Sequence, residues 1–156
     1  MIDRSEKLKL YTKEVKNYLR KVGHKLGFDT IEEYDTGSGK IDLVWCKKLE
    51  YPLKNGQNLP IVGFEIEASW RTQKHLKGDV FNLLSLSPSL GVILLIEKGF
   101  DRTKGKSGFN LKNNINSIKR YINGYGGVSR LEVWTARDVE ELYNRVFDSN
   151  YDFFKM

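Results

Sequence analysis

The chain has 156 residues, 40% of them hydrophobic, which suits one globular domain spanning residues 1–156. Its 26 Lys and Arg residues outnumber 20 Asp and Glu residues, and the net charge of +6, distributed along the chain, favours a polyanionic partner. The aliphatic runs are too short to span a bilayer, and the single cysteine, Cys46, excludes an intrachain disulfide, so we expect a cytoplasmic protein.

The first elements predicted along the chain are a helix and three strands. Apolar residues three and four positions apart predict an amphipathic helix from Ser5 to Leu26. Strands are predicted over Phe28–Tyr34, Lys40–Cys46 and Ile61–Ala68, with turn residues between the first two. The charged stretch from Lys47 to Pro60 is predicted to be a connecting loop.

Helices and strands alternate in the remainder of the chain. They are expected over residues 69–86 (helix), 90–97 (strand), 111–122 (helix), 131–135 (strand) and 136–147 (helix). The resulting order, αβββαβαβα, predicts an α/β fold in which helices flank a central five-stranded sheet. We expect that sheet to be mixed, because tight connections join the early strands.

Two acidic residues interrupt the strand that is predicted over 61–68. Glu65 and Glu67 are two positions apart, so their side chains share one face of the strand at a separation of about 6.6 Å. Two ionised carboxylates at that distance repel by roughly 2.5 kcal/mol at an effective dielectric of about 20. A divalent cation between them turns this repulsion into attraction. The alternative is an edge strand with one ordinary polar face.

A third acid, Asp42, lies inside the apolar strand that is predicted over 40–46. If this strand pairs with the one that carries Glu65 and Glu67, the three acids converge and supply the oxygen ligands that Mg²⁺ or Mn²⁺ prefers. The carbonyl of Ile66 is a further candidate ligand, and Glu14 on the first helix is a metal-ligand candidate that acts through a water. The alternatives are a turn or salt-bridge role for Asp42 and a solvated position for Glu14.

These segments resemble the PD-(D/E)XK nuclease superfamily over roughly residues 5–96. Gly37-Ser-Gly-Lys-Ile-Asp42 is similar to the "PD" strand of that family, and Glu65-Ile-Glu67 is similar to its "(D/E)XK" strand. Within the family the chain looks most like archaeal Holliday junction resolvases. The resemblance implies a restriction endonuclease-like fold and a Mg²⁺-dependent (or Mn²⁺-dependent) endonuclease. It also implies a homodimer that cuts duplex or branched DNA, with Asp42 and Glu65 as the metal ligands.

Glu67 departs from the family pattern, in which a lysine usually occupies this position. A glutamate there serves as a general base toward the attacking water or binds a second metal ion. Lys77, which shares a side of the next predicted helix with Gln73, is the candidate to take over the catalytic role of the lysine. The other interpretation is a catalytically inactive nucleic-acid-binding module of the same fold.

Basic and polar residues near the predicted site are candidates for contacts with nucleic-acid phosphates. They are Ser38, Lys40, Arg71, Gln73, Lys74, Lys104 and Lys106. The last two belong to the segment Gly99–Ser107, which is similar to a phosphate-binding P-loop but has five residues, rather than four, between its glycines. We therefore predict a basic loop there, and a nucleoside triphosphatase is the less favoured alternative.

Overall fold

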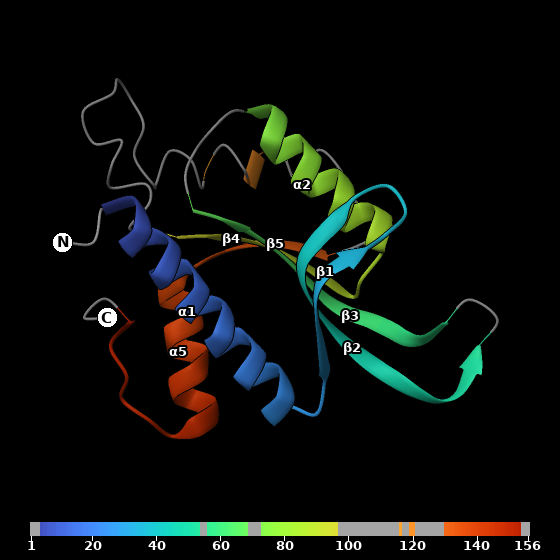
Figure 1. Cartoon of the computed structure of the whole chain (residues 1–156), viewed down its shortest axis with the longest axis horizontal. Helices are drawn as coiled ribbons and strands as arrows, with labels where there is room; N and C mark the ends of the chain where they lie inside the picture. The colour runs from blue at the N-terminus through green and yellow to red at the C-terminus, as the bar shows by residue number, and fades with distance from the viewer. Residues whose placement is uncertain are drawn as a thin grey trace.

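The computed structural model describes residues 4–53, 56–68, 73–96, 116, 119–120 and 130–153. Three continuous helices pack on a five-stranded mixed sheet, which confirms the predicted α/β class (Figure 1). The elements are α1 (Arg4–Lys25), β1 (Asp29–Asp35), β2 (Lys40–Leu53), β3 (Gly56–Glu67), α2 (Gln73–Leu86), β4 (Leu90–Leu95), β5 (Arg130–Thr135) and α5 (Ala136–Phe147). Of the helix predicted over 111–122, residues 116, 119 and 120 are helical and the others lie outside the described residues.

The strands lie in the sheet in their sequence order, β1-β2-β3-β4-β5. The first three strands are antiparallel neighbours, whereas β3, β4 and β5 run parallel to one another. A parallel connection requires a crossover, and α2 lies in the crossover between β3 and β4. The middle strand is therefore β3, which is paired on both sides.

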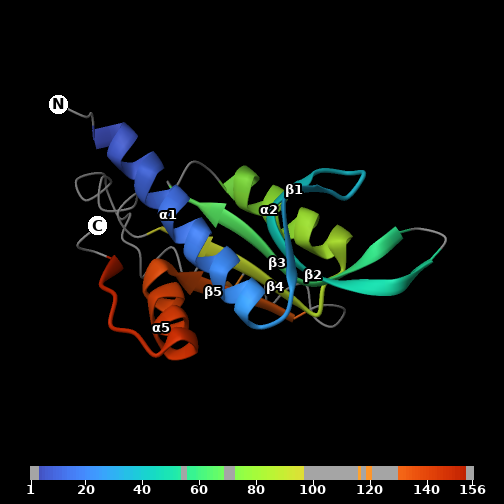
Figure 2. The same ribbon diagram turned by 60° about the horizontal axis from the view of Figure 1, so that its bottom comes forward.

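Helices cover both faces of the sheet. On one face α1 and α5 pack through buried residues such as Val15, Leu19 and Val139, and on the other face α2 packs through Val80 and Leu83. Figures 1 and 2 show α1 and α5 side by side, away from α2. Cys46 is buried in the α2 layer. Among the described residues, the helices are too short or too polar to cross a membrane.

A glycine in the middle strand lets α2 approach the sheet closely. A Cβ atom at Gly63 would lie 2.8 Å from Leu86 Cδ2 and 3.1 Å from Leu83 Cδ2. A larger residue at this position would therefore require the side chains of Leu83 and Leu86, or α2 itself, to shift. Gly63 is two residues before Glu65 on the same face, and the close approach therefore brings α2 against the acidic part of β3.

The predicted loop over 47–60 is wrong, because most of this segment is strand. β2 continues to Leu53 and β3 begins at Gly56, so the two form a long hairpin that extends away from the helices (Figure 2). Its charged residues are compatible with strand structure, because an antiparallel ribbon that extends away from the core can keep its side chains in water. Pro60 is tolerated beside a register shift in the ladder at Trp45/Cys46.

Candidate functional site

The candidate site begins where β2 and β3 separate. Their ladder of paired residues ends at Leu43 opposite Phe64, and one step further in the same register Asp42 stands opposite Glu65. There the backbone N–H of Ile66 donates a hydrogen bond to Asp42 Oδ2 at 2.7 Å. A side-chain carboxyl thus takes the place of a ladder carbonyl, and it directs the acidic group of β2 toward β3.

Both glutamates of β3 project toward α2, on the face opposite to Phe64. Asn82 of α2 donates its Nδ2 to Glu65 Oε1 at 3.4 Å, and Asp79 of α2 is hydrogen-bonded to Glu67. Glu65 is only 5% exposed, whereas Glu67 is partly exposed. Because β3 is the middle strand of the sheet, the interpretation of this segment as an edge strand with a polar face is wrong.

Two residues of α2 complete an acidic cluster that we define as Asp42, Glu65, Glu67 and Asp79, with Asn82 beside it. Neither Asp79 nor Asn82 is among the residues predicted from the sequence. A signal was available, because Asp79 is four residues before the buried Leu83 and so lies on the inward side of the helix. Position 39 in the β1–β2 connection must be glycine for Asn82 to stay in place, since a Cβ there would collide with Asn82 Oδ1.

Burial and mutual repulsion hold protons on the cluster. Burial, followed by the charges of Asp42 and Asp79, raises the pKa of Glu65 to about 10. Burial, followed by a hydrogen bond with Glu67 and the charge of that residue, raises the pKa of Asp79 to about 9. Within the described part of the chain, no cation is among the groups that shift either pKa. Both carboxyls are therefore protonated at neutral pH, and neighbouring carboxyl groups contribute to both shifts.

The oxygen donors of the cluster match the ligand preference of Mg²⁺ or Mn²⁺. Asp79 Oδ2 is buried without a hydrogen-bond partner, which is the kind of atom that a cation satisfies. Among the residues that the structure describes, however, no three His, Cys, Asp or Glu side chains are already arranged to hold a metal ion. Glu65 and Asp42 are instead hydrogen-bonded to each other, which contributes to the raised pKa of Glu65. Carboxyl groups are ligands for a divalent cation only when they are deprotonated.

Glu14 and Lys77 were both predicted to belong to the site, but neither is part of the acidic cluster. Glu14 is exposed on α1, where its charge acts on Tyr18, and α1 covers the face of the sheet opposite to the one that carries Glu65. Lys77 is exposed on α2 and is not among the groups that shift the pKa of Glu65 or of Asp79. The structure therefore separates Glu14 from the acidic cluster, whereas Lys77 lies on α2, the helix that carries Asp79 and Asn82.

The predicted phosphate contacts are described only in part. Ser38 and Lys40 are exposed in and after the β1–β2 turn, whose Gly39 touches Asn82. Gln73 and Lys74 belong to the first turn of α2, where only the backbone is described. Arg71, Lys104 and Lys106 lie outside the described residues, as does the P-loop-like segment. The two described side chains thus border the site on the side of the β1–β2 turn.

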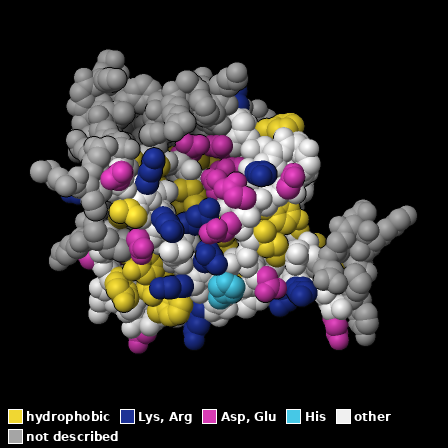
Figure 3. Space-filling view, in the orientation of Figure 1, with side chains coloured by type: hydrophobic (Ala, Val, Ile, Leu, Met, Phe, Trp, Pro, Cys, Tyr) yellow, Lys and Arg dark blue, Asp and Glu magenta, His cyan; other side chains and the backbone are white. Residues whose placement is uncertain are grey.

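Charge is unevenly distributed on the surface around the cluster. Figure 3 shows Asp and Glu side chains gathered between α1 and α2, with Lys and Arg side chains over α1 directly beside them. Side chains of opposite charge are thus neighbours on this face of the molecule.

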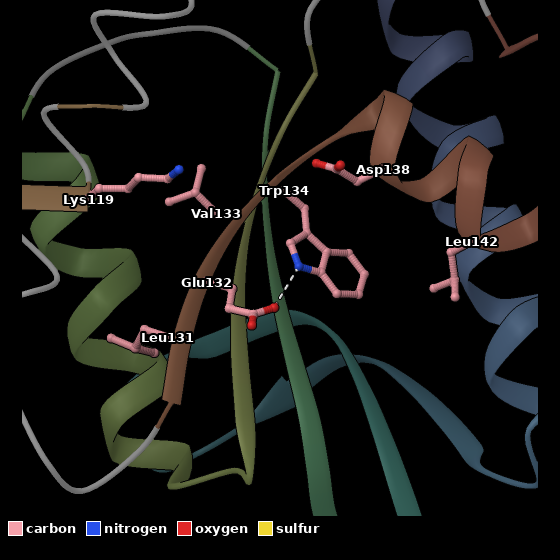
Figure 4. A pocket seen from close by; sticks show the side chains of 7 residues that line it. All are labelled: Lys119, Leu131, Glu132, Val133, Trp134, Asp138 and Leu142. Carbon is pink, nitrogen blue, oxygen red and sulfur yellow. Dashed lines mark hydrogen bonds between the residues drawn. The ribbon is translucent and has the colours of Figure 1, made fainter.

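A cavity of about 460 Å³ beside β5 is separate from the acidic cluster. Val133 and Trp134, which lie on opposite faces of the strand, both line this cavity (Figure 4). Its acids serve local structure, because Glu132 accepts a hydrogen bond from the Trp134 indole and Asp138 accepts one from the backbone N–H of Thr135 at the start of α5. The two acids that line this cavity are therefore already engaged, and the acidic cluster is the better candidate site.

Comparisons of the chain with protein-family models, with curated proteins and with solved structures find no match. Function must therefore be inferred from the geometry and electrostatics of the acidic cluster.

Proposed function

We propose that this protein is a metal-dependent endonuclease of the PD-(D/E)XK type that hydrolyses phosphodiester bonds in duplex or branched DNA. The observation that carries the proposal is the pair Asp42 and Glu65, which face each other where β2 and β3 part. Asp79 brings another carboxyl to the same place from α2. A stable domain rarely gathers this much acid in its sheet without a ligand to neutralise it.

The residues have distinct roles in this mechanism. Asp42 and Glu65 are the ligands for Mg²⁺ or Mn²⁺, and the Asn82 amide keeps the Glu65 carboxyl oriented. The bound ion supplies Lewis-acid stabilisation of the phosphate charge and a lower pKa for water. Glu67 accepts a proton from the attacking water as general base, while the water oxygen forms the new bond to phosphorus. The ester oxygen leaves as that bond breaks, and it takes a proton from solvent.

The proposal includes a homodimer, because cutting both strands of a duplex requires two such sites. Supercoiled plasmid and four-way junctions are the substrates to test. We expect wild-type protein to cut at least one of them with Mg²⁺ or Mn²⁺ and to stop when EDTA is added. Intact substrates under all metal conditions would reject the endonuclease.

Calorimetry tests the metal site without a substrate. We expect Mn²⁺ binding to release protons near pH 7, because the ion must displace the proton that Glu65 holds. The measured heat should therefore change between two buffers that have different ionisation enthalpies. Asp42→Asn removes a charged ligand and should lose most of this heat, whereas heat that is independent of the buffer and of Asp42 would place the ion elsewhere.

A second candidate function is a nucleic-acid-binding module that has no catalytic activity. Glu67 favours it, because this position holds an acid where the related nucleases usually have a lysine. Such a module binds DNA with an affinity that falls steeply as salt rises, does not cut DNA and need not bind Mg²⁺. The cleavage and calorimetric measurements distinguish these two functions directly.

A further inference from the structure

The positive charge of the protein is concentrated in one helix. α1 holds eight of the 26 Lys and Arg residues and two of the 20 Asp and Glu residues, so the rest of the chain is balanced at 18 of each. The composition suggested that the excess of positive charge is distributed along the chain, and this expectation is wrong. The net charge of +6 is the excess of α1 alone.

Four of these cations form a row along one side of α1. Lys9, Lys13, Lys16 and Arg20 are spaced by four, three and four residues, which places them within about 60° of one another around a helix that turns 100° per residue. We call this row the α1 stripe. It extends over about 16 Å at 1.5 Å per residue, which corresponds to roughly five base-pair steps of 3.4 Å.

The α1 stripe lies toward the β1 edge of the sheet, and the acidic cluster is on the opposite face, around that edge. Arg20 Nη1 lies 3.5 Å from Glu32 Oε1, which fixes this side of α1 against β1. Glu32 is paired with Leu43 of β2, the residue that follows Asp42. Figure 3 shows Lys and Arg side chains over α1, with Asp and Glu side chains beside them on the same face of the molecule.

The other cations of α1 provide an internal comparison. Lys7, Lys21 and Lys25 lie on the opposite edge of the helix, and Lys21 sits 5.3 Å from the centre of the Tyr18 ring. That ring packs against Tyr143 of α5 with a centroid distance of 4.6 Å. This edge, the α5-facing edge, therefore points away from the acidic cluster, although it carries the same kind of charge.

We propose that the α1 stripe is the surface that holds the phosphate backbone of a DNA duplex and leads it to the acidic cluster. One cation per helical turn fits a polymer whose charges repeat along its length. A lipid surface fits less well, because the apolar side of α1 is already used in the core, where Val15 and Leu19 are fully buried. The inference rests on the proposed function, since it names the surface that presents the substrate to that site.

The test compares two triple variants of the full chain for binding to a duplex of about 16 base pairs in EDTA, where no cleavage occurs. Lys9→Gln/Lys13→Gln/Lys16→Gln changes the stripe, and Lys7→Gln/Lys21→Gln/Lys25→Gln removes the same charge from the α5-facing edge. If each stripe lysine contacts one phosphate, the slope of log K against log salt becomes less steep by about 2.7. The stripe variant then binds roughly 500-fold more weakly than wild type at about 0.1 M salt.

We expect the control variant to change this slope by less than about one phosphate contact. Equal losses in both variants, or no loss in either, would overturn the inference, as would stripe-dependent binding to anionic vesicles but not to the duplex. Circular dichroism of both variants confirms that each is folded before binding is compared. The experiment distinguishes failure of this inference from failure of the proposed function. A salt slope that depends on the stripe, without any metal-dependent cleavage, supports the DNA-binding surface and rejects the nuclease. Metal-dependent cleavage with no effect of the stripe on binding supports the nuclease and rejects the surface.

Discussion

Asp42→Asn and Glu65→Gln are each expected to abolish metal-dependent DNA cleavage while leaving the fold intact. Each change removes a charged oxygen donor but keeps the size of the side chain. In Asp42→Asn the new amide oxygen can still accept the hydrogen bond from the Ile66 N–H that Asp42 Oδ2 accepts at 2.7 Å. Loss of a partner outside the ligand sphere costs about 10- to 100-fold in metal affinity or activity, so loss of a direct ligand should cost more.

Glu141→Gln is a matched control for both changes, because Glu141 is exposed on α5, on the face of the sheet away from the acidic cluster. Cleavage rates are measured at saturating Mn²⁺ as well as at low Mn²⁺, so that weakened metal binding and a lost catalytic step are separated. We expect Glu141→Gln to cut at the wild-type rate. Residual cleavage by Asp42→Asn near the wild-type rate would show that the ion, if one is used, is held by other residues.

The sequence predicts the meeting of Asp42 and Glu65 because the relevant structure is periodic. Alternation along a strand assigns Glu65 and Glu67 to one face, and pairing of neighbouring strands places Asp42 opposite Glu65. Neither step depends on how helices pack. Tight connections between the early strands likewise predict the mixed sheet, and the predicted bounds of the last helix agree with α5.

The contribution of α2 is not predictable in the same way. Which residues of a helix face a strand depends on its rotation and distance, and here these follow from tertiary contacts such as those of Leu83 and Leu86 over Gly63. Asp79 and Asn82 reach the cluster as a consequence of that packing. Helix periodicity alone made Glu14 a candidate for the cluster, but the sheet lies between α1 and the face that carries Glu65.

Glu65→Gln is expected to raise the stability of the metal-free protein at neutral and alkaline pH. The pKa of Glu65 is about 10 in the folded chain and 4.5 in the unfolded chain. The contribution of Glu65 to the free energy of unfolding is therefore complete below pH 4.5 and is lost as the pH rises toward 10. Each pH unit in this window costs about 1.4 kcal/mol, or roughly 3 kcal/mol at pH 7. Gln does not titrate, and its amide can hydrogen-bond to both Asp42 and Asn82 in place of the protonated acid.

Thermal unfolding in EDTA at several pH values measures this effect. For a chain of this length, roughly 3 kcal/mol corresponds to a rise of about 6 to 12 °C in Tm at pH 7, and the gap between variant and wild type should widen up to pH 9 and close near pH 4.5. Glu141→Gln should stay within about 0.5 kcal/mol of wild type at every pH. A variant that is less stable than wild type at pH 8 would mean that a cation of the protein compensates the Glu65 charge.

The same experiment with Mn²⁺ in place of EDTA links stability to the proposed metal site. The ion is expected to raise the Tm of the wild type by mass action, by the equivalent of about 2.7 kcal/mol at 100 times its Kd. Glu65→Gln lacks the charged ligand and should gain little, so the stability advantage of the variant shrinks or reverses when the ion is present. This reversal is expected only if Glu65 binds the ion. If Glu65 has no role in metal binding, Mn²⁺ leaves the difference in Tm between variant and wild type unchanged.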